Sequence, residues 1–94
     1  MTTKFKYSDE QVYLGFDYVN RLDGETILTA IFMIVGPAIT NDDVSMLTGT
    51  AVIDGTKVRN MVVGGTAGNS YSLSSLITTS AGRTLKGKLT LQVG

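Results

Sequence analysis

Residues 62–93 read VVGGTAGNSYSLSSLITTSAGRTLKGKLTLQV and contain the clearest strand pattern in the chain. Over residues 84–93, apolar residues and a glycine alternate with polar residues, which is typical of an antiparallel strand with one buried face. Residues 70–78 show the same pattern more loosely. Between the two, Ser80-Ala81-Gly82-Arg83 places a glycine where a hairpin turn needs a positive φ. The expected inward-facing residues are Tyr71, Leu73, Ile77, Leu85, Gly87, Leu89, Leu91 and Val93.

The rest of the chain contains further short apolar runs separated by turn signals. The strands expected from these runs cover residues 11–19, 25–35, 46–53 and 56–63. Asp23-Gly24 and Asp54-Gly55 supply turns, and Gly36-Pro37 ends the second strand because proline cannot donate to a strand ladder. Short strands at intervals of about ten residues predict an all-β, immunoglobulin-like sandwich of about seven antiparallel strands.

The length and composition indicate a single domain. The chain has 94 residues, of which 43% are hydrophobic, so it is too short for a second core and too apolar for disorder. Residues 1–10 are polar and mixed in charge, and we expect a flexible N-terminal arm before a sandwich domain over residues 11–94. The N-terminus lacks the apolar segment of a secretory signal, and the apolar run 27–35 is about half of the roughly 20 residues that span a bilayer. These features predict a soluble protein made in a cytoplasm.

The sequence lacks the residues on which most catalytic sites depend. It contains no cysteine and no histidine, which excludes disulfides, thiolate nucleophiles, imidazole bases and nearly all transition-metal sites. Serine and threonine are frequent, but no base is present to activate their hydroxyl groups. We therefore expect no enzyme activity, no catalytic residue and no cofactor.

Two stretches resemble binding loops without meeting their full requirements. Asn41-Asp42-Asp43, together with Asp54, could supply oxygen ligands for calcium, but the spacing and distal glutamate of an EF-hand are missing. A solvated loop is favoured, and no metal site is predicted. The run Gly64-Gly65-Thr66-Ala67-Gly68 resembles a phosphate cradle, but a strand follows it where such a cradle needs a helix N-terminus. We expect a turn there.

The expected strand over residues 25–35 lacks the alternation of its neighbours. One face presents Leu28, Ala30, Phe32 and Ile34, and the other presents Ile27, Thr29, Ile31, Met33 and Val35. A strand with one face in water should be polar on that face, so both faces are expected to be covered. Two interpretations stay open: a central strand buried within the domain, or a subunit interface over Ile31, Met33 and Val35.

Charges are distributed unevenly along the chain. All eight carboxylates lie in residues 1–54, whereas residues 55–94 contain only basic charges. The formal net charge of zero gives no general reason to expect nucleic acid or membrane as a partner. Either strands from both halves interleave and neutralise one another, or the molecule docks through complementary faces. For the second interpretation, Arg83, Lys86 and Lys88 form a small cationic stripe and join the candidate interface residues.

Three stretches carry a resemblance to a known group of proteins. They are Leu14-Gly15-Phe16-Asp17, then Gly24-Glu25-Thr26-Ile27 leading to Phe32, and Gly64-Gly65-Thr66-Ala67-Gly68 with Tyr71, followed by Ile77-Thr78-Thr79-Ser80-Ala81-Gly82-Arg83-Thr84. On these residues the chain resembles small tail-proximal virion proteins of tailed bacteriophages and prophages, including the fibre-tail adaptor proteins. Those proteins often have tryptophan at the position of Phe32. The resemblance implies an immunoglobulin-like fold, no cofactor and a structural role in the virion.

The expected function is therefore that of a non-enzymatic fibre-tail adaptor. It would contact other phage structural proteins and copies of itself, and would reach the virion after synthesis in the bacterial cytoplasm. Two alternatives stay open. One is a capsid decoration protein that stabilises the shell from outside. The other is a carbohydrate- or receptor-binding adhesin, for which no tryptophan and four tyrosines supply few aromatic rings.

Overall fold

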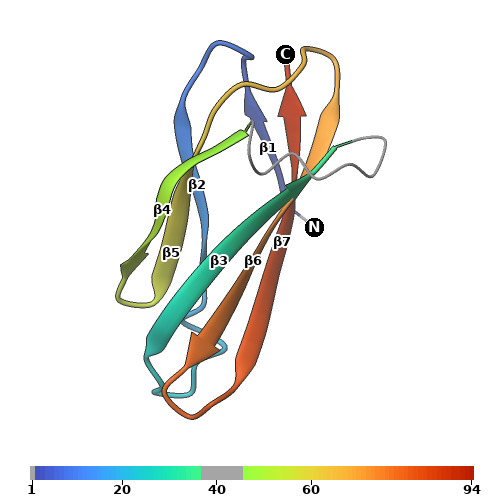
Figure 1. Cartoon of the computed structure of the whole chain (residues 1–94). Helices are drawn as coiled ribbons and strands as arrows, with labels where there is room; N and C mark the ends of the chain where they lie inside the picture. The colour runs from blue at the N-terminus through green and yellow to red at the C-terminus, as the bar shows by residue number, and fades with distance from the viewer. Residues whose placement is uncertain (1, 37–45) are drawn as a thin grey trace.

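A computed structural model describes residues 2–36 and 46–94, and these residues form two packed β-sheets (Figure 1). The strands are β1 (Thr2–Lys6), β2 (Val12–Asp17), β3 (Ile27–Val35), β4 (Leu47–Asp54), β5 (Lys57–Val62), β6 (Ser70–Thr79) and β7 (Thr84–Val93). The all-β sandwich expected from the sequence is confirmed. Within the described ranges, no helix is both long and apolar enough to cross a membrane.

The two sheets differ in size and in the direction of their pairings. One has four strands in the order β1-β7-β6-β3, and the other has three in the order β2-β5-β4. β1 runs parallel to β7, whereas the other pairings are antiparallel. The β6–β7 hairpin pairs without a register shift from Ser70 opposite Gln92 to Thr78 opposite Thr84. Gly82 in its turn has φ 82°, so the hairpin predicted from the sequence is confirmed.

The core lies between the sheets and consists of inward-facing aliphatic and aromatic side chains. Its fully buried members include Tyr18, Ile34, Val58, Val62, Leu73, Ile77 and Leu91. Phe16 of β2 stacks on Phe32 of β3, with ring centroids 6.1 Å apart, and so joins the two sheets. A Cβ atom on Gly87 would lie 2.8 Å from the Phe16 ring and from the Tyr18 hydroxyl. The glycine in β7 therefore makes room for these two aromatic side chains.

The N-terminal segment departs from the flexible arm expected over residues 1–10. Thr2–Lys6 form β1, which pairs in parallel with β7 at the edge of the four-stranded sheet. Lys6 is fully buried, and its Nζ atom donates hydrogen bonds to the carbonyls of Tyr7 and Gly64 at 2.7 and 2.6 Å. Backbone pairing does not require apolar side chains, and the lysine stem packs as an aliphatic chain. The polar composition of this segment therefore does not reveal its strand.

At the start of β3, two residues face the opposite way from the faces assigned to them in the sequence analysis. The register with β6 shifts between Ile27 and Thr29, so that one extra residue is inserted there. As a result Ile27 is buried and Leu28 is exposed, the reverse of the faces expected for these two residues. From Thr29 to Val35 the pairing with β6 continues without a further shift. Phe32 and Ile34 point into the core.

Candidate interaction surface

Three strands of the four-stranded sheet bring apolar and basic side chains to its solvent side. Ile31 of β3 is paired with Leu76 of β6, which is paired in turn with Lys86 of β7. In the next row, Met33 of β3 is paired with Ser74 of β6, which is paired in turn with Lys88 of β7. Residues directly opposite one another on antiparallel strands share a face. We call this surface the outer face and define it by Ile31, Met33, Val35, Leu76, Lys86 and Lys88.

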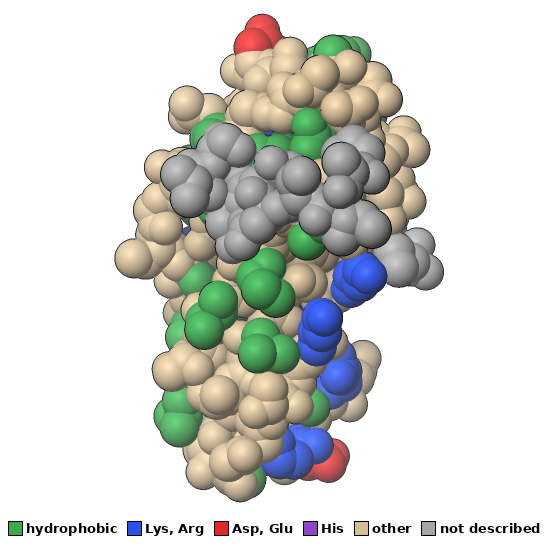
Figure 2. All heavy atoms as spheres, turned by 45° about the vertical axis from the view of Figure 1, so that its right-hand side comes forward, with side chains coloured by type: hydrophobic (Ala, Val, Ile, Leu, Met, Phe, Trp, Pro, Cys, Tyr) green, Lys and Arg blue, Asp and Glu red, His purple; other side chains and the backbone are tan. Residues whose placement is uncertain are grey.

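Three of the four apolar residues of the outer face are open to solvent, and the fourth, Val35, is half-buried. The exposed fractions are 60% for Ile31, 39% for Met33 and 37% for Leu76. Figure 2 shows a hydrophobic cluster with a row of Lys and Arg side chains along one side; among the described residues, acidic side chains appear only near the ends of the view. Because β3 lies at the edge of its sheet, the interpretation of a buried central strand is wrong. The interface interpretation stays a prediction, now with five of its six residues on one face.

The two lysines of this face are not neutralised within the described part of the chain. Lys86 and Lys88 are exposed, and neither forms an ion pair with a carboxylate of residues 2–36 or 46–94. In the three-residue rows of the sheet, they lie two strands away from Ile31 and Met33. The lysines therefore border the apolar cluster.

Arg83, the sixth predicted interface residue, forms an ion pair and hydrogen bonds with other residues of the same chain. Its Nη2 atom lies 2.7 Å from Glu25 Oε2, and its Nε donates to both carboxylate oxygens at 3.1 and 3.0 Å. Nη2 also donates to the carbonyl of Arg21 at 2.8 Å. Hydrogen bonds from Arg83 and then from Thr79 lower the pKa of Glu25, and the same carboxylate raises the pKa of Arg83. This pair joins the start of β3 to the β6–β7 turn. Arg83 therefore has an acidic partner, whereas Lys86 and Lys88 have none among the described residues.

Leu76 belongs to the outer face although the sequence analysis does not identify it. Strict alternation from Tyr71 places Leu76 outward and Ser75 inward. The structure shows that arrangement, with Ser75 fully buried and hydrogen-bonded to the Tyr18 hydroxyl. A serine at an inward position and a leucine at an outward one break the usual hydrophobic pattern. The serine at position 75 followed by the leucine at position 76 is therefore the feature of the sequence from which Leu76 could have been identified as an outward-facing residue.

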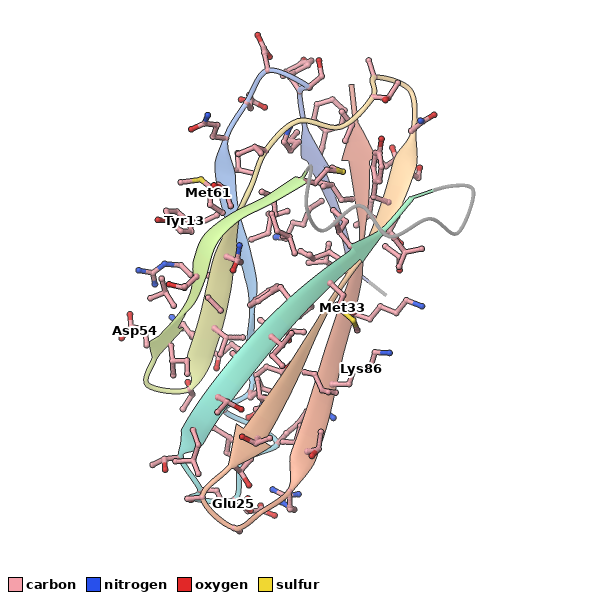
Figure 3. The ribbon with its side chains drawn as sticks, in the orientation of Figure 1. Tyr13, Glu25, Met33, Asp54, Met61 and Lys86 are labelled. Carbon is pink, nitrogen blue, oxygen red and sulfur yellow. The ribbon has the colours of Figure 1, made fainter. Side chains whose placement is uncertain are left out.

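The three-stranded sheet presents a different surface on the opposite side of the molecule. Its hollow has a volume of about 300 Å³ and is lined by Tyr13, Gly15, Phe16, Asp17, Lys57, Val58 and Arg59. Tyr13 is exposed, and the Arg59 guanidinium lies 5.4 Å from its ring centroid. Figure 3 shows Tyr13 and Met61 on this side, away from Met33 and Lys86. The hollow combines one aromatic ring with charged groups.

Asp17 in this hollow already has hydrogen-bond partners. Its Oδ1 atom accepts hydrogen bonds from the Thr56 hydroxyl at 2.8 Å and from the Val19 amide at 3.0 Å. These bonds lower the pKa of Asp17, the Thr56 bond having the larger effect. Within residues 2–36 and 46–94, acidic side chains form no group of three or more that could hold a metal ion. Asn41-Asp42-Asp43 lie outside the described residues, so the calcium hypothesis for that loop stays open.

Comparisons with known proteins agree with the resemblance found in the sequence. A search of curated proteins gives no significant match. A family model described as "Podophage GP4 fiber-tail adaptor protein gp77" matches residues 6–92. The match runs from the end of β1 into the last residues of β7 and includes every residue of the outer face. The chain therefore belongs to the podophage fiber-tail adaptor family.

Proposed function

We propose that this chain is a non-enzymatic connector of the podophage virion that joins tail and fibre proteins through its outer face. Membership of the fiber-tail adaptor family supports a phage structural role. The observation that carries the finer proposal is the solvent-exposed cluster of Ile31, Met33 and Leu76 beside two lysines that form no ion pair with residues 2–36 or 46–94. The family description also favours the tail over the capsid-decoration alternative.

The chemistry of the outer face suggests the kind of partner it would bind. Removing apolar surface from water contributes about 25 cal/mol per Å², so covering the exposed cluster would favour association. Lys86 and Lys88 at its border would attract acidic groups and speed the encounter, an effect that salt weakens. The expected partner is a tail or fibre protein with an apolar patch bordered by Asp or Glu.

The lowered pKa values of Asp17 and Glu25 agree with a non-enzymatic role. A general acid needs a pKa raised toward neutrality so that it keeps a proton to donate. The resolved shifts run in the opposite direction, because hydrogen bonds lower the pKa of both Asp17 and Glu25. Both carboxylates therefore remain ionised near neutral pH. Neither Asp17 nor Glu25 therefore fits the role of a general acid, and the sequence contains no histidine or cysteine.

The immunoglobulin-like topology is part of the same proposal. The division into a β1-β7-β6-β3 sheet and a β2-β5-β4 sheet is compatible with it. Tyr71 near the start of β6 gives further support, since its hydroxyl accepts a 2.8 Å hydrogen bond from the Thr66 amide five residues upstream. A tyrosine near the start of the sixth strand that bonds back to the preceding corner is typical of such sandwiches.

Binding measurements with the tail and fibre proteins of the same phage would test the connector role. We expect Lys86→Glu/Lys88→Glu to weaken binding at least tenfold, about 1.4 kcal/mol, because it places two acids where the partner's acids are expected. Lys57→Glu, on the other sheet, is the matched control and should bind normally. Equal binding by the double variant and the wild type would contradict the proposal, as would loss of binding confined to Lys57→Glu.

A second candidate function, carbohydrate or receptor binding, is favoured by the hollow around Tyr13. An exposed ring beside Arg59 and Lys57 could stack on a sugar and contact its hydroxyl or acidic groups. A glycan-binding screen of the wild type and Tyr13→Ala would test this candidate. Glycans bound by the wild type and lost in Tyr13→Ala would support it, and a screen without binding would remove it.

A further inference from the structure

The solvent side of β2 has an aromatic ring and a carboxylate on either side of a glycine. Tyr13, Gly15 and Asp17 are exposed and alternate with half-buried residues along the strand, and all three line the hollow of about 300 Å³. A Cβ atom on Gly15 would lie 1.9 Å from the Val58 carbonyl oxygen, so no side chain can stand between Tyr13 and Asp17. The volume is at the lower end of the range for small-molecule sites, about 300–1,000 Å³.

The charges on this side of the three-stranded sheet balance. Lys57 lies opposite Asp17 of β2 and opposite Asp54 of β4. Arg59 Nη1 lies 3.7 Å from Asp54 Oδ2. Two basic groups therefore lie beside two carboxylates. An anionic ligand such as a phosphate or a nucleic acid needs an excess of positive charge, so this surface favours an uncharged ligand.

We propose that the hollow binds a neutral oligosaccharide, with one sugar ring on Tyr13 and the hydroxyl groups of a neighbouring ring on Asp17 and Lys57. This inference rests on the second candidate function and narrows it to uncharged sugars. Figure 3 shows Tyr13 and Asp54 on the opposite side of the molecule from Met33 and Lys86. The connector role of the outer face therefore does not depend on this site.

Tyr13 supplies an apolar surface whose orientation is restricted. Its side chain is 55% exposed, and the Arg59 guanidinium lies over the ring, 5.4 Å from its centroid. The attraction between a cation and an aromatic ring favours this arrangement over other positions of the ring. The C–H face of a sugar is apolar and packs on an aromatic ring, while the hydroxyl groups at its rim stay available for hydrogen bonds.

Asp17 and Lys57 supply an acceptor and a donor side by side. Asp17 Oδ1 accepts hydrogen bonds from the Thr56 hydroxyl at 2.8 Å and the Val19 amide at 3.0 Å, which orient the carboxylate. Within residues 2–36 and 46–94, Asp17 Oδ2 accepts no hydrogen bond and Lys57 forms no ion pair. Asp17 and Lys57 are directly opposite on β2 and β5. Adjacent sugar hydroxyls both donate and accept, so one can donate to Asp17 and its neighbour accept from Lys57.

The separation of these contacts sets the length of the ligand. Tyr13 and Asp17 are four residues apart on β2, about 14 Å at about 3.4 Å per residue. A single sugar ring is too short to contact both, so the contacts fall on successive units of a chain. An oligosaccharide should therefore bind more tightly than the monosaccharide from which it is built.

An array of neutral oligosaccharides and of acidic ones that contain uronic or sialic acid tests the ligand class with the full chain. We expect binding to neutral oligosaccharides. Calorimetric titration with the strongest neutral array ligand should give at least about tenfold higher affinity than with its monosaccharide. The affinity should be the same at low and high salt, because the ligand carries no charge.

The outcomes of the array separate this inference from the functions on which it depends. Binding confined to acidic oligosaccharides would overturn the inference and leave the second candidate function standing. An array without binding would remove both. Neither result affects the connector role, which the Lys86→Glu/Lys88→Glu variant tests on the other sheet.

Two substitutions with matched controls test the residues of the site. Tyr13→Ala and Asp17→Asn remove the stacking ring and the acceptor oxygen, and each should weaken binding of the same ligand at least about tenfold. Tyr7→Ala, with 57% exposure against 55% for Tyr13, and Asp9→Asn, in the turn after β1, lie outside the hollow and should bind like the wild type. Circular dichroism and thermal unfolding confirm that each variant folds. Wild-type affinity in both Tyr13→Ala and Asp17→Asn, or an equal loss in the two controls, would overturn the proposal.

Discussion

The Nζ atom of Lys6 donates a 2.6 Å hydrogen bond to the carbonyl of Gly64 and so ties the end of β1 to the turn after β5. The two residues are 58 positions apart in sequence. Lys6 is fully buried, and the bonds to Gly64 and Tyr7 are the contacts that satisfy its ammonium group in the described structure. This contact helps to hold β1 against the edge of β7 that does not pair with β6.

Replacing Lys6 with methionine should therefore destabilise the fold. Methionine keeps an apolar stem but leaves two carbonyls without their donor, and we expect the free energy of unfolding to fall by about 1–3 kcal/mol. Lys4→Met, at an exposed position of the same strand, should change it by less than about 0.5 kcal/mol. Urea denaturation of both variants measures the difference. Equal stabilities of the two variants would show that the Lys6 bonds do not hold β1.

The ion pair between Glu25 and Arg83 should make stability depend on pH in the acid range. The pKa of Glu25 in the folded state lies below its ordinary value of 4.5, chiefly because of the Arg83 hydrogen bond. The unfolded state therefore binds protons first as pH falls, so this stabilisation is full above pH 4.5 and is lost as pH drops through the folded pKa. Asp17 acts in the same direction.

Melting temperatures of the wild type and Glu25→Gln over the acid range test this contribution. Glu25→Gln should be less stable than the wild type near neutral pH, and the two curves should converge as the solution becomes acidic. Arg83→Gln should behave similarly, because it removes the other partner of the pair. A constant difference between wild type and Glu25→Gln at every pH would contradict the assignment.

Two glycines in the strands should differ in their tolerance of alanine. A Cβ on Gly15 would lie 1.9 Å from the Val58 carbonyl oxygen, which is backbone of the paired strand and cannot move without opening β2 from β5. At Gly87 the nearest atoms belong to the side chains of Phe16 and Tyr18, which can shift. We expect Gly15→Ala to cost about 3 kcal/mol or more and Gly87→Ala less, about 1–2 kcal/mol. Denaturation midpoints that rank the two variants in the reverse order would contradict this account.

Neighbouring positions on β3 should respond in opposite ways to a charge. Ile31 faces solvent, so Ile31→Asp should cost less than about 1 kcal/mol and leave a folded monomer. Ile34 is fully buried, so Ile34→Asp should cost at least about 4 kcal/mol by combining a cavity with a buried charge. Circular dichroism and thermal unfolding separate the two outcomes. If Ile31→Asp unfolds the chain, Ile31 belongs to the core and the outer face is wrongly assigned.

The sequence predicts well those parts of the molecule that local patterns determine. Alternation and a turn glycine are enough to place the β6–β7 hairpin and the inward side chains of both strands. Structural features that depend on contacts between residues distant in sequence cannot be predicted from these local patterns. β1 forms because it can pair with the edge of β7 that β6 does not occupy. Arg83 does not join Lys86 and Lys88 on the outer face, because it bonds to Glu25, 58 residues away in sequence. The bulge that turns Ile27 toward the core and Leu28 toward solvent also depends on the register between β3 and β6.

Chemical labelling of assembled particles tests the central claim, that the outer face contacts other virion proteins. The cysteine-free background allows single-cysteine variants, and Leu76→Cys on the outer face has a matched control in Ile53→Cys on β4, with exposures of 37% and 39%. A maleimide reagent should label both variants in the free protein. In purified particles we expect Leu76→Cys to be protected and Ile53→Cys to remain reactive. Equal labelling of Leu76→Cys in free protein and particles would contradict the account.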